Sequence, residues 1–466
     1  MKKLSCFLGL LLAASAASAR VYSVGEGFPL KTPDDVPWES LYPGDVVEIH
    51  WRLLPYRSKW VMCAQGRKEL PITVRGVPSA DGLLPIIDGR NATTRDQLNF
   101  WGEERAVIKI GGANKPVDTM PSHIVIESLD IRGARRGNVF TGRTGSGEYR
   151  PNAAAIYIEK GRGITLRDCV FHDCGNGLIT SSDCEELLIQ RCHFYGNGNV
   201  DSIYEHNSYT SSRGIVYEFC RFGPLLEGAG GNNLKDRSAG LVVRYNWIEG
   251  GTRMLDLVDA DDRLTVGDDR YHATHVYGNV LIKDDVSSNH QIVHFGGDSG
   301  KKQNYRNGLL YFYNNTVVSR RTKNSTLFRL SSGGQSVYMA NNLVYLTALG
   351  NRLEVVTGEG PVYGYRNWFK EGWKMSRSKF NPSSSLTDTL SGEKPGFNDP
   401  ENDDYRLAEG SECLGSGAYL KGDLVPDHAV RFHYFPGGDG VPRSRNGQPN
   451  HERPDIGAYE VAAPRD

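Results

Sequence analysis

Apolar and polar residues alternate in short segments along most of the chain, and these segments share one repeated pattern. Segments such as ITLRDCVF, LLIQRCHF and IVYEFCRF place alternating apolar residues before a Cys, or in later copies an Asn, with a further apolar pair after it. Alternation with a period of two predicts strands. The marked residues lie between 23 and 36 positions apart: Cys169, Cys192, Cys220, Asn246, Asn279, Asn315, Asn342 and Asn367, with Leu129 in an earlier copy. A strand repeat of this length predicts a β-solenoid, in which each coil stacks on the last.

Stacked coils place equivalent side chains in columns. Cys169, Cys192 and Cys220 are expected to stack inside as small apolar side chains rather than to form disulfides. The asparagines from Asn246 onward are expected to form a ladder of amide hydrogen bonds. Glycine makes up 54 of the 466 residues, and we expect Gly and Asn at the corners because they accept a positive φ.

The ends of the chain differ from the repeat. Residues 1–19 combine two lysines, an apolar run and a small-residue cleavage site, which predicts a secretory signal peptide. Residues 20–466 are interpreted as a single domain. Within it, 20–60 would cap the N-terminal end, with a short helix in TPDDVPWESL beginning near Thr32 or Asp34, and 381–466 would form a loop-rich tail. A secreted or periplasmic location follows from the leader.

The charge balance argues against some partners. Lys and Arg number 54 and Asp and Glu 55, for a net charge of −1, whereas nucleic-acid-binding proteins usually carry a basic excess. After the leader no apolar run is long enough to span a membrane as a helix. We therefore expect no nucleic acid, no membrane span and a monomer.

Several phrases resemble one known group of proteins. YPGDVVEI, PITVRGV and PIIDGRNA look like early coils, and RPDIGAYE like a terminal phrase, of the right-handed parallel β-helix proteins that act on polysaccharides. The resemblance covers nearly the whole mature chain. It implies an all-β, right-handed parallel β-helix with a short N-terminal capping segment, and a polysaccharide as partner.

The densest polar stretch lies between Asp201 and Asp269 and spans three adjacent coils. Equivalent residues on stacked coils lie ~4.8 Å apart, so one groove is expected to contain His206, Tyr209, Lys235, Arg237, Arg253 and Asp256. Cations would neutralise the carboxylate of a uronate-containing polysaccharide, and Lys, Tyr or His would remove its C5 proton. Such a lysine needs a depressed pKa, which the neighbouring Arg237 is expected to supply.

The order Lys235, RYN at 244–246, then Arg253 resembles polysaccharide lyase family 6, the alginate and chondroitin lyases. This resemblance implies that Lys235 is the general base and that Arg253 assists the leaving group or binds the carboxylate. Calcium is the cofactor it implies, although only Glu227 precedes Lys235 closely. Arg237 and His206 are candidates to neutralise substrate charge in its place, and Tyr209 is an alternative acid or base.

Further residues are candidates for binding rather than catalysis. These substrate-binding candidates are Asp256, Asn207, Asn233, His294 and Arg150, the last in an arginine-rich insertion that would wall the groove.

The preferred function is a lyase that cleaves an anionic polysaccharide by β-elimination. One alternative is a glycoside hydrolase that uses the carboxylates between Asp256 and Asp262, since hydrolysis needs two carboxyl groups. The other is a non-catalytic carbohydrate-binding or adhesin β-helix, because a solenoid offers a long face to a polymer.

Overall fold

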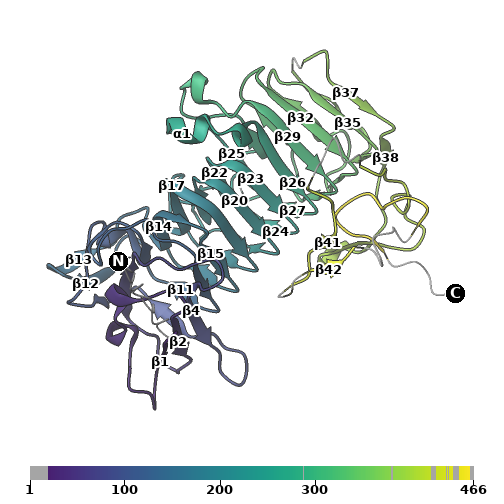
Figure 1. Cartoon of the computed structure of the whole chain (residues 1–466). Helices are drawn as coiled ribbons and strands as arrows, with labels where there is room; N and C mark the ends of the chain where they lie inside the picture. Colours follow the sequence, from purple (N-terminus) through teal and green to yellow (C-terminus); the bar gives the residue numbers. More distant parts are fainter. Residues whose placement is uncertain are drawn as a thin grey trace, which may run out of the picture.

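The computed structural model describes residues 19–286, 288–378, 381–420, 427–436, 438, 440–443 and 451–461. The chain winds into a parallel β-helix whose coils stack along one long axis (Figure 1). Three rows of parallel strands run along this axis. The expected all-β parallel β-helix is confirmed.

The first row contains β1(Val21–Val24), β2(Val46–His50), β4(Ile72–Val77), β10(Ile124–Glu127), β15(Thr165–Arg167), the second half of β17(Asn176–Gln190), β20(Arg213–Glu218), β23(Ala239–Arg244), β26(Ala273–Tyr277), β29(Gly308–Tyr313), β32(Gln335–Ala340), β35(Val362–Tyr365) and β37(Ser385–Thr387). The second row contains β3(Ser58–Met62), β8(Ala106–Ile110), β14(Ala154–Arg162), the first half of β17, β19(Ser208–Thr210), β22(Leu234–Asp236), β25(Leu255–Leu257), β28(Gln291–Phe295), β31(Ser325–Leu330) and β34(Leu353–Thr357).

The third row is an 11-stranded sheet of β5(Ile86–Asp88), β11(Asp130–Arg132), β16(Val170–His172), β18(His193–Tyr195), β21(Arg221–Phe222), β24(Trp247–Glu249), β27(Val280–Lys283), β30(Thr316–Ser319), β33(Leu343–Leu346), β36(Trp368–Lys370) and β38(Leu390–Gly392). Outside the rows lie β6(Ala92–Thr94), β7(Asn99–Phe100), β9(Ala113–Lys115), β12(Val139–Gly142), β13(Gly145–Glu148), β39(Phe397–Asp399), β40(Asp404–Leu407), β41(Phe432–His433) and β42(Val441–Pro442). The helical segments are short: α1(Arg263–Val266) and the 3-10 turns Pro33–Asp35, Trp38–Ser40, Glu103–Arg105, Asp269–His272, Lys302–Asn304 and Pro400–Asn402.

The marked residues of the repeat form the corner between the first and third rows. Each amide of the ladder donates through Nδ2 to the Oδ1 of the next, at 3.0 Å from Asn246 to Asn279 and 3.0 Å from Asn279 to Asn315. The cysteines are free and buried, and Cys192 and Cys220 donate through Sγ to backbone carbonyls of the preceding coil. Both predicted columns are confirmed.

The backbone at this corner differs from the expectation. The residue with positive φ is the one before the marked position, and it is often neither Gly nor Asn: φ is 52° at Arg191, 56° at Phe219 and 57° at Tyr245. A left-handed conformation at such residues carries a steric cost. The side chain of the marked Asn offsets this steric cost with a hydrogen bond to the backbone of the corner. For example, Asn246 Oδ1 accepts the N–H of Cys220 at 2.8 Å.

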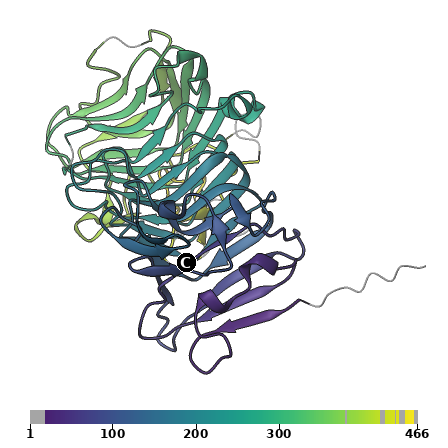
Figure 2. The same ribbon diagram turned by 90° about the vertical axis from the view of Figure 1, so that its left-hand side faces the viewer.

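The two ends are covered differently (Figures 1 and 2). In place of one helix, TPDDVPWESL forms two 3-10 turns, with Thr32 at the N-cap of the first, and Trp38 stacks on Trp60 with ring centroids 4.7 Å apart. At the other end β37 and β38 add a further coil, so the helix continues beyond residue 381. The later tail packs along the outside, where Tyr313 Oη donates to the carbonyl of His428 at 2.6 Å.

The predicted signal peptide lies outside the described residues, except for residue 19. Within the part of the chain that is described, no helix is long and apolar enough to cross a membrane. The single-domain organisation, with a cap at 20–60 and a tail from 381, remains a prediction.

Candidate functional site

Four polar residues form a column on the outer face of the second row. The strand register pairs Tyr209 with Lys235, Lys235 with Asp256, and Asp256 with His294. Their neighbours along the strands, such as Leu234 and Leu255, point inward and are fully buried. The strands alternate, so the same short segments that supply core leucines also present this polar column outward.

The column forms part of a cavity of about 500 Å³. It brings together six residues that the sequence placed in one groove: His206, Tyr209, Lys235, Arg237, Arg253 and Asp256. The other lining residues are Ile203, Tyr204, Gly230, Asn232, Thr252, Asn289, Asp298 and Ser299.

Lys235 lies between two carboxylates. Its Nζ donates to Asp256 Oδ2 at 2.8 Å and also to Asp298 Oδ2. Burial disfavours the ammonium, yet the two carboxylates outweigh burial and raise the pKa of Lys235. The expectation that neighbouring cations depress this pKa is therefore wrong, because the nearest charges are negative.

Both carboxylates are held ionised. Burial alone would raise the pKa of Asp256, but the hydrogen bond from His294 and the charges of Lys235 and Arg253 bring it far below its usual range. The side chain of Asp298 is 32% exposed, and Lys235 and Arg237 lower its pKa although partial burial opposes this. Three cations therefore face two carboxylates in the cavity.

Arg237 is bound to Tyr209. Its Nε donates to the phenol oxygen at 2.9 Å, while Nη2 donates to Asp298 Oδ1 at 3.0 Å. These contacts fix the guanidinium beside the phenol oxygen. A cation that donates to this oxygen stabilises negative charge on it.

His206 is neutral, which contradicts its expected role as a cation. Burial, together with the charge of Lys235, lowers its pKa to about 3. The backbone N–H of Asn232 donates to Nδ1 at 2.9 Å, so the ring proton is assigned to Nε2. The edge of the ring meets Tyr209 in a T-shaped contact with centroids 5.4 Å apart, so His206 can orient the phenol and donate a hydrogen bond.

Arg253 and His294 both bind Asp256. Arg253 Nη1 lies 3.2 Å from Asp256 Oδ1, and its Nε donates to Gln291 Oε1 at 2.9 Å. His294 Nδ1 lies 2.8 Å from the same carboxylate oxygen, and Nε2 lies 2.8 Å from Ser331 Oγ. Arg253 lines the cavity and can contact a ligand, whereas His294 lies behind Asp256 and positions it.

Three predicted binding residues lie elsewhere. Asn207 and Asn233 are fully buried inside the coil, where Asn207 Nδ2 donates to Asn233 Oδ1 at 2.7 Å. They are corner amides, because they are fully buried and do not line the cavity. Arg150 is exposed and pairs with Glu104 at 2.8 Å, and it does not line the cavity.

Of the carboxylates between Asp256 and Asp262, Asp256 lines the cavity and Asp259, Asp261 and Asp262 do not. Asp259 accepts the backbone N–H of Asp298 at 2.8 Å, which holds the loop that carries Asp298. Asp262 caps α1 by accepting the N–H of Thr265 at 2.8 Å. Hydrolysis needs one carboxyl protonated, but the pKa values of Asp256 and Asp298 are both lowered.

Asp256 and Asp298 do not suit calcium, which takes six to eight oxygen ligands. Asp256 and Asp298 already bind Lys235, Arg237 and Arg253. In the described ranges no group of three or more His, Cys, Asp or Glu side chains is placed to hold a metal ion. The donor set therefore fits lysine and arginine better than calcium.

Asn232 is a site residue that sequence reasoning did not assign, whereas Asp298 follows His294 in the sequence and is expected with it at the edge of the groove. Asn232 Nδ2 donates to Asp256 Oδ2 at 2.8 Å, and its Oδ1 accepts the N–H of Arg253 at 3.1 Å. Asn232 directly precedes Asn233, which is a corner amide. The sequence does not distinguish these two asparagines, and only the course of the backbone shows that Asn232 is the one that faces the cavity. Asp298 lies on a loop one coil beyond Asp256 and lines the cavity.

Comparisons with known proteins bear on the fold. No family model matches the sequence, and no curated protein matches it. Among solved structures, one match covers 95% of this chain and 96% of the other, at 13% identity and a TM-score of 0.53. That structure is pectate lyase Pel9A. At this identity the match shows a common fold and no more, and it agrees with the resemblance to parallel β-helix proteins that act on polysaccharides.

Other solved structures match less closely. An alginate lyase from Paenibacillus sp. str. FPU-7 matches at 12% identity and a TM-score of 0.47, over 69% of this chain and 94% of the other. A family 6 alginate lyase matches at 13% identity and a TM-score of 0.35, over 84% of this chain and 57% of the other. Glycoside hydrolases are also among the matches.

Proposed function

We propose that this protein is a secreted lyase that cleaves a uronate-containing polysaccharide by β-elimination in the cavity around Lys235. The observation that carries the proposal is one cavity that contains Lys235, Arg237 and Arg253 together with Tyr209, whose phenol oxygen accepts a hydrogen bond from Arg237 Nε at 2.9 Å. Lys235, Arg237 and Arg253 are the cations of this cavity that could face the carboxylate of a uronate.

Tyr209 is the proposed base. β-Elimination requires a group that removes the C5 proton while a cation stabilises the charge that develops on the C6 carboxylate. In this proposal Tyr209 reacts as the phenolate: its Oη, bound by Arg237 Nε, takes the C5 proton, and the C4–O bond breaks as the C4–C5 double bond forms. The resulting phenol then returns the proton to the leaving oxygen. Lys235 suits the electrostatic role rather than the basic one, because its raised pKa keeps it protonated.

Arg253 and His206 are the proposed substrate contacts beside this centre. Arg253 is only partly buried and can turn toward a sugar carboxylate, while its bond to Asp256 keeps it at the cavity wall. His206 donates through Nε2 to a sugar hydroxyl. Arg253, at the wall of the cavity, favours an acidic over a neutral polymer.

The test is a screen against alginate, pectate, chondroitin, glucuronan and neutral glucans. Ultraviolet absorbance of the new conjugated double bond and new reducing ends are followed together. Both signals from an acidic polymer support elimination. Reducing ends without absorbance indicate hydrolysis and refute the proposal, and silence in both favours the binding-only alternative.

Two substitutions separate the roles of Tyr209 and Lys235. Tyr209→Phe removes the base and is expected to lower kcat by about 10²- to 10⁴-fold. Tyr204→Phe is the matched control, because Tyr204 lines the same cavity and is 74% exposed. Lys235→Arg keeps the positive charge and should retain part of the activity. If Lys235→Arg is completely inactive while Tyr209→Phe keeps activity, the base is Lys235.

A further inference from the structure

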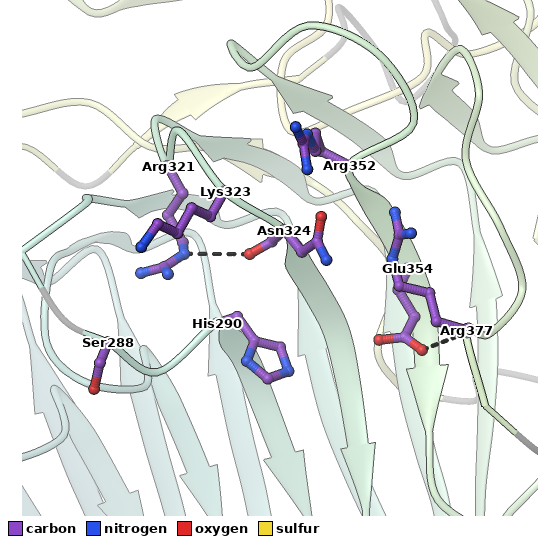
Figure 3. A pocket seen from close by; sticks show the side chains of 8 residues that line it. All are labelled: Ser288, His290, Arg321, Lys323, Asn324, Arg352, Glu354 and Arg377. Atoms are coloured by element: carbon purple, nitrogen blue, oxygen red, sulfur yellow. Dashed lines mark hydrogen bonds between the residues drawn. The ribbon is translucent and has the colours of Figure 1, made fainter.

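A second cavity, of about 390 Å³, lies further along the same strand row (Figure 3). Its lining residues are Ser288, His290, Arg321, Lys323, Asn324, Arg352, Glu354 and Arg377. Asn289 lines the first cavity, whereas its neighbours Ser288 and His290 line this one. The two cavities therefore adjoin through one short segment of chain.

The second cavity carries an excess of positive charge. Arg321, Lys323, Arg352 and Arg377 line it with one carboxylate, that of Glu354. Arg321 also pairs at 3.6 Å with Asp285, which is not among the lining residues. In the part of the chain that the structure describes, neither Lys323 nor Arg352 forms an ion pair. In Figure 3, Arg321 and Lys323 lie on one side of His290, and Arg352 and Arg377 lie on the other.

Glu354 does not neutralise these cations. Its Oε2 accepts from the hydroxyl of Thr326 at 2.7 Å, and its Oε1 accepts from the hydroxyl of Ser376 at 3.1 Å and from the backbone N–H of Arg377 at 2.6 Å. The carboxylate thus serves to hold the segment that carries Arg377. Burial and the charges of Arg321 and Lys283 lower the pKa of His290, which leaves the ring neutral among the cations.

The spacing of the strands sets the distance between the cavities. The strands that carry Lys235, Asp256, His294, Thr326 and Glu354 are successive neighbours in the second row. Four steps of ~4.8 Å place Glu354 ~19 Å along the row from Lys235. An extended sugar chain that lies along this row reaches both cavities.

We infer that the second cavity is an anion-binding subsite, which holds the carboxylate of a uronate several sugars away from the bond that is cleaved. The inference rests on the proposed function, because it assigns to the same polymer a second contact on the same face. Lys323 and Arg352 supply its unpaired positive charge, and neutral His290 offers a ring against which a sugar can pack.

The test compares two double substitutions that remove the same charge. Lys323→Gln with Arg352→Gln changes the subsite, and Lys68→Gln with Arg136→Gln is the control, since both of its positions are exposed and distant from the cavities in the chain. Alginate, polygalacturonate and glucuronan are the probes, with a neutral glucan for comparison, in affinity gel electrophoresis. The subsite variant should bind the retained acidic polymer about tenfold more weakly, and the control should bind it like the wild type.

The outcomes separate this inference from the proposed function. Loss of binding in both double variants alike, or no retention of the wild type by any acidic polymer, overturns the subsite. If an acidic polymer is retained through Lys323 and Arg352 but never cleaved, the subsite stands and the lyase proposal fails. If a polymer is cleaved and the subsite variant has the KM of the control, the lyase proposal stands and the subsite fails.

Discussion

Asn315 is the middle rung of the amide ladder, and its replacement by alanine is expected to destabilise the β-helix strongly. Its Oδ1 accepts the backbone N–H of Asn279 at 3.0 Å, and its Nδ2 donates to the carbonyl of Val276 at 3.0 Å. All of these groups are buried. Asn315→Ala therefore leaves the N–H of Asn279 and the carbonyl of Val276 without this partner. It also removes one hydrogen bond each from Asn279 Nδ2 and Asn342 Oδ1, which keep other partners.

The size of the destabilisation follows from the N–H of Asn279 and the carbonyl of Val276, which lose their partner. A buried polar group that loses its partner costs about 1–3 kcal/mol, so the free energy of unfolding should fall by about 2–6 kcal/mol. That is a large share of the ~5–15 kcal/mol by which folded domains are stable.

Urea unfolding followed by circular dichroism measures this change. Asn114→Ala is the control, because Asn114 is exposed and its amide makes one long contact of 3.4 Å with Asn99. An Asn315→Ala protein no less stable than the control would refute the reasoning, since it would mean that water or a backbone shift replaces the ladder bonds without cost.

Two further predictions concern pH and metal. His206 has its ordinary pKa in the unfolded chain, but in the folded protein its pKa is about 3. Between these two pH values the unfolded state binds more protons than the folded state. This residue therefore lowers the free energy of unfolding as pH falls from about 6.5 toward 3, by at most ~1.4 kcal/mol per pH unit. Urea unfolding at pH 7 and pH 5 should therefore show a smaller loss in His206→Gln than in the wild type, and equal losses would contradict the assignment. Treatment with EGTA is expected to leave cleavage unchanged, because lysine and arginine occupy the carboxylates that calcium would need; activity that is lost and then restored by added calcium would show otherwise.

The fold was predictable because the first and third rows carry a regular signal. Their strands flank the marked Cys or Asn, and the alternation on either side continues over many coils. Around the cavity the second row gives almost no such signal, because β19, β22 and β25 are three residues long and no marked Cys or Asn joins them to a further strand. A period of two cannot be recognised over so few residues, and the intervening loops vary in length.

The site was predictable as a region but not as a mechanism. The density of His, Tyr, Lys, Arg and Asp in one stretch located the cavity correctly, since three neighbouring coils supply these residues. The charge state of Lys235 was not predictable, because it depends on Asp298, which lies 63 positions away and reaches Lys235 only through the stacking of two further coils.

The sequence by itself determined the solenoid, the cysteine and asparagine columns, and the polar stretch that lines the cavity, because each depends on a local pattern repeated at a regular interval. Only the tertiary structure decided which side chains meet. It buried Asn207 and Asn233 in the interior while Asn232 faced the cavity, and it placed two carboxylates beside Lys235 and made His206 neutral. The physical reason is that charge and pKa depend on neighbours in space, and in a β-helix the nearest neighbours of a residue lie one coil away rather than next in the chain.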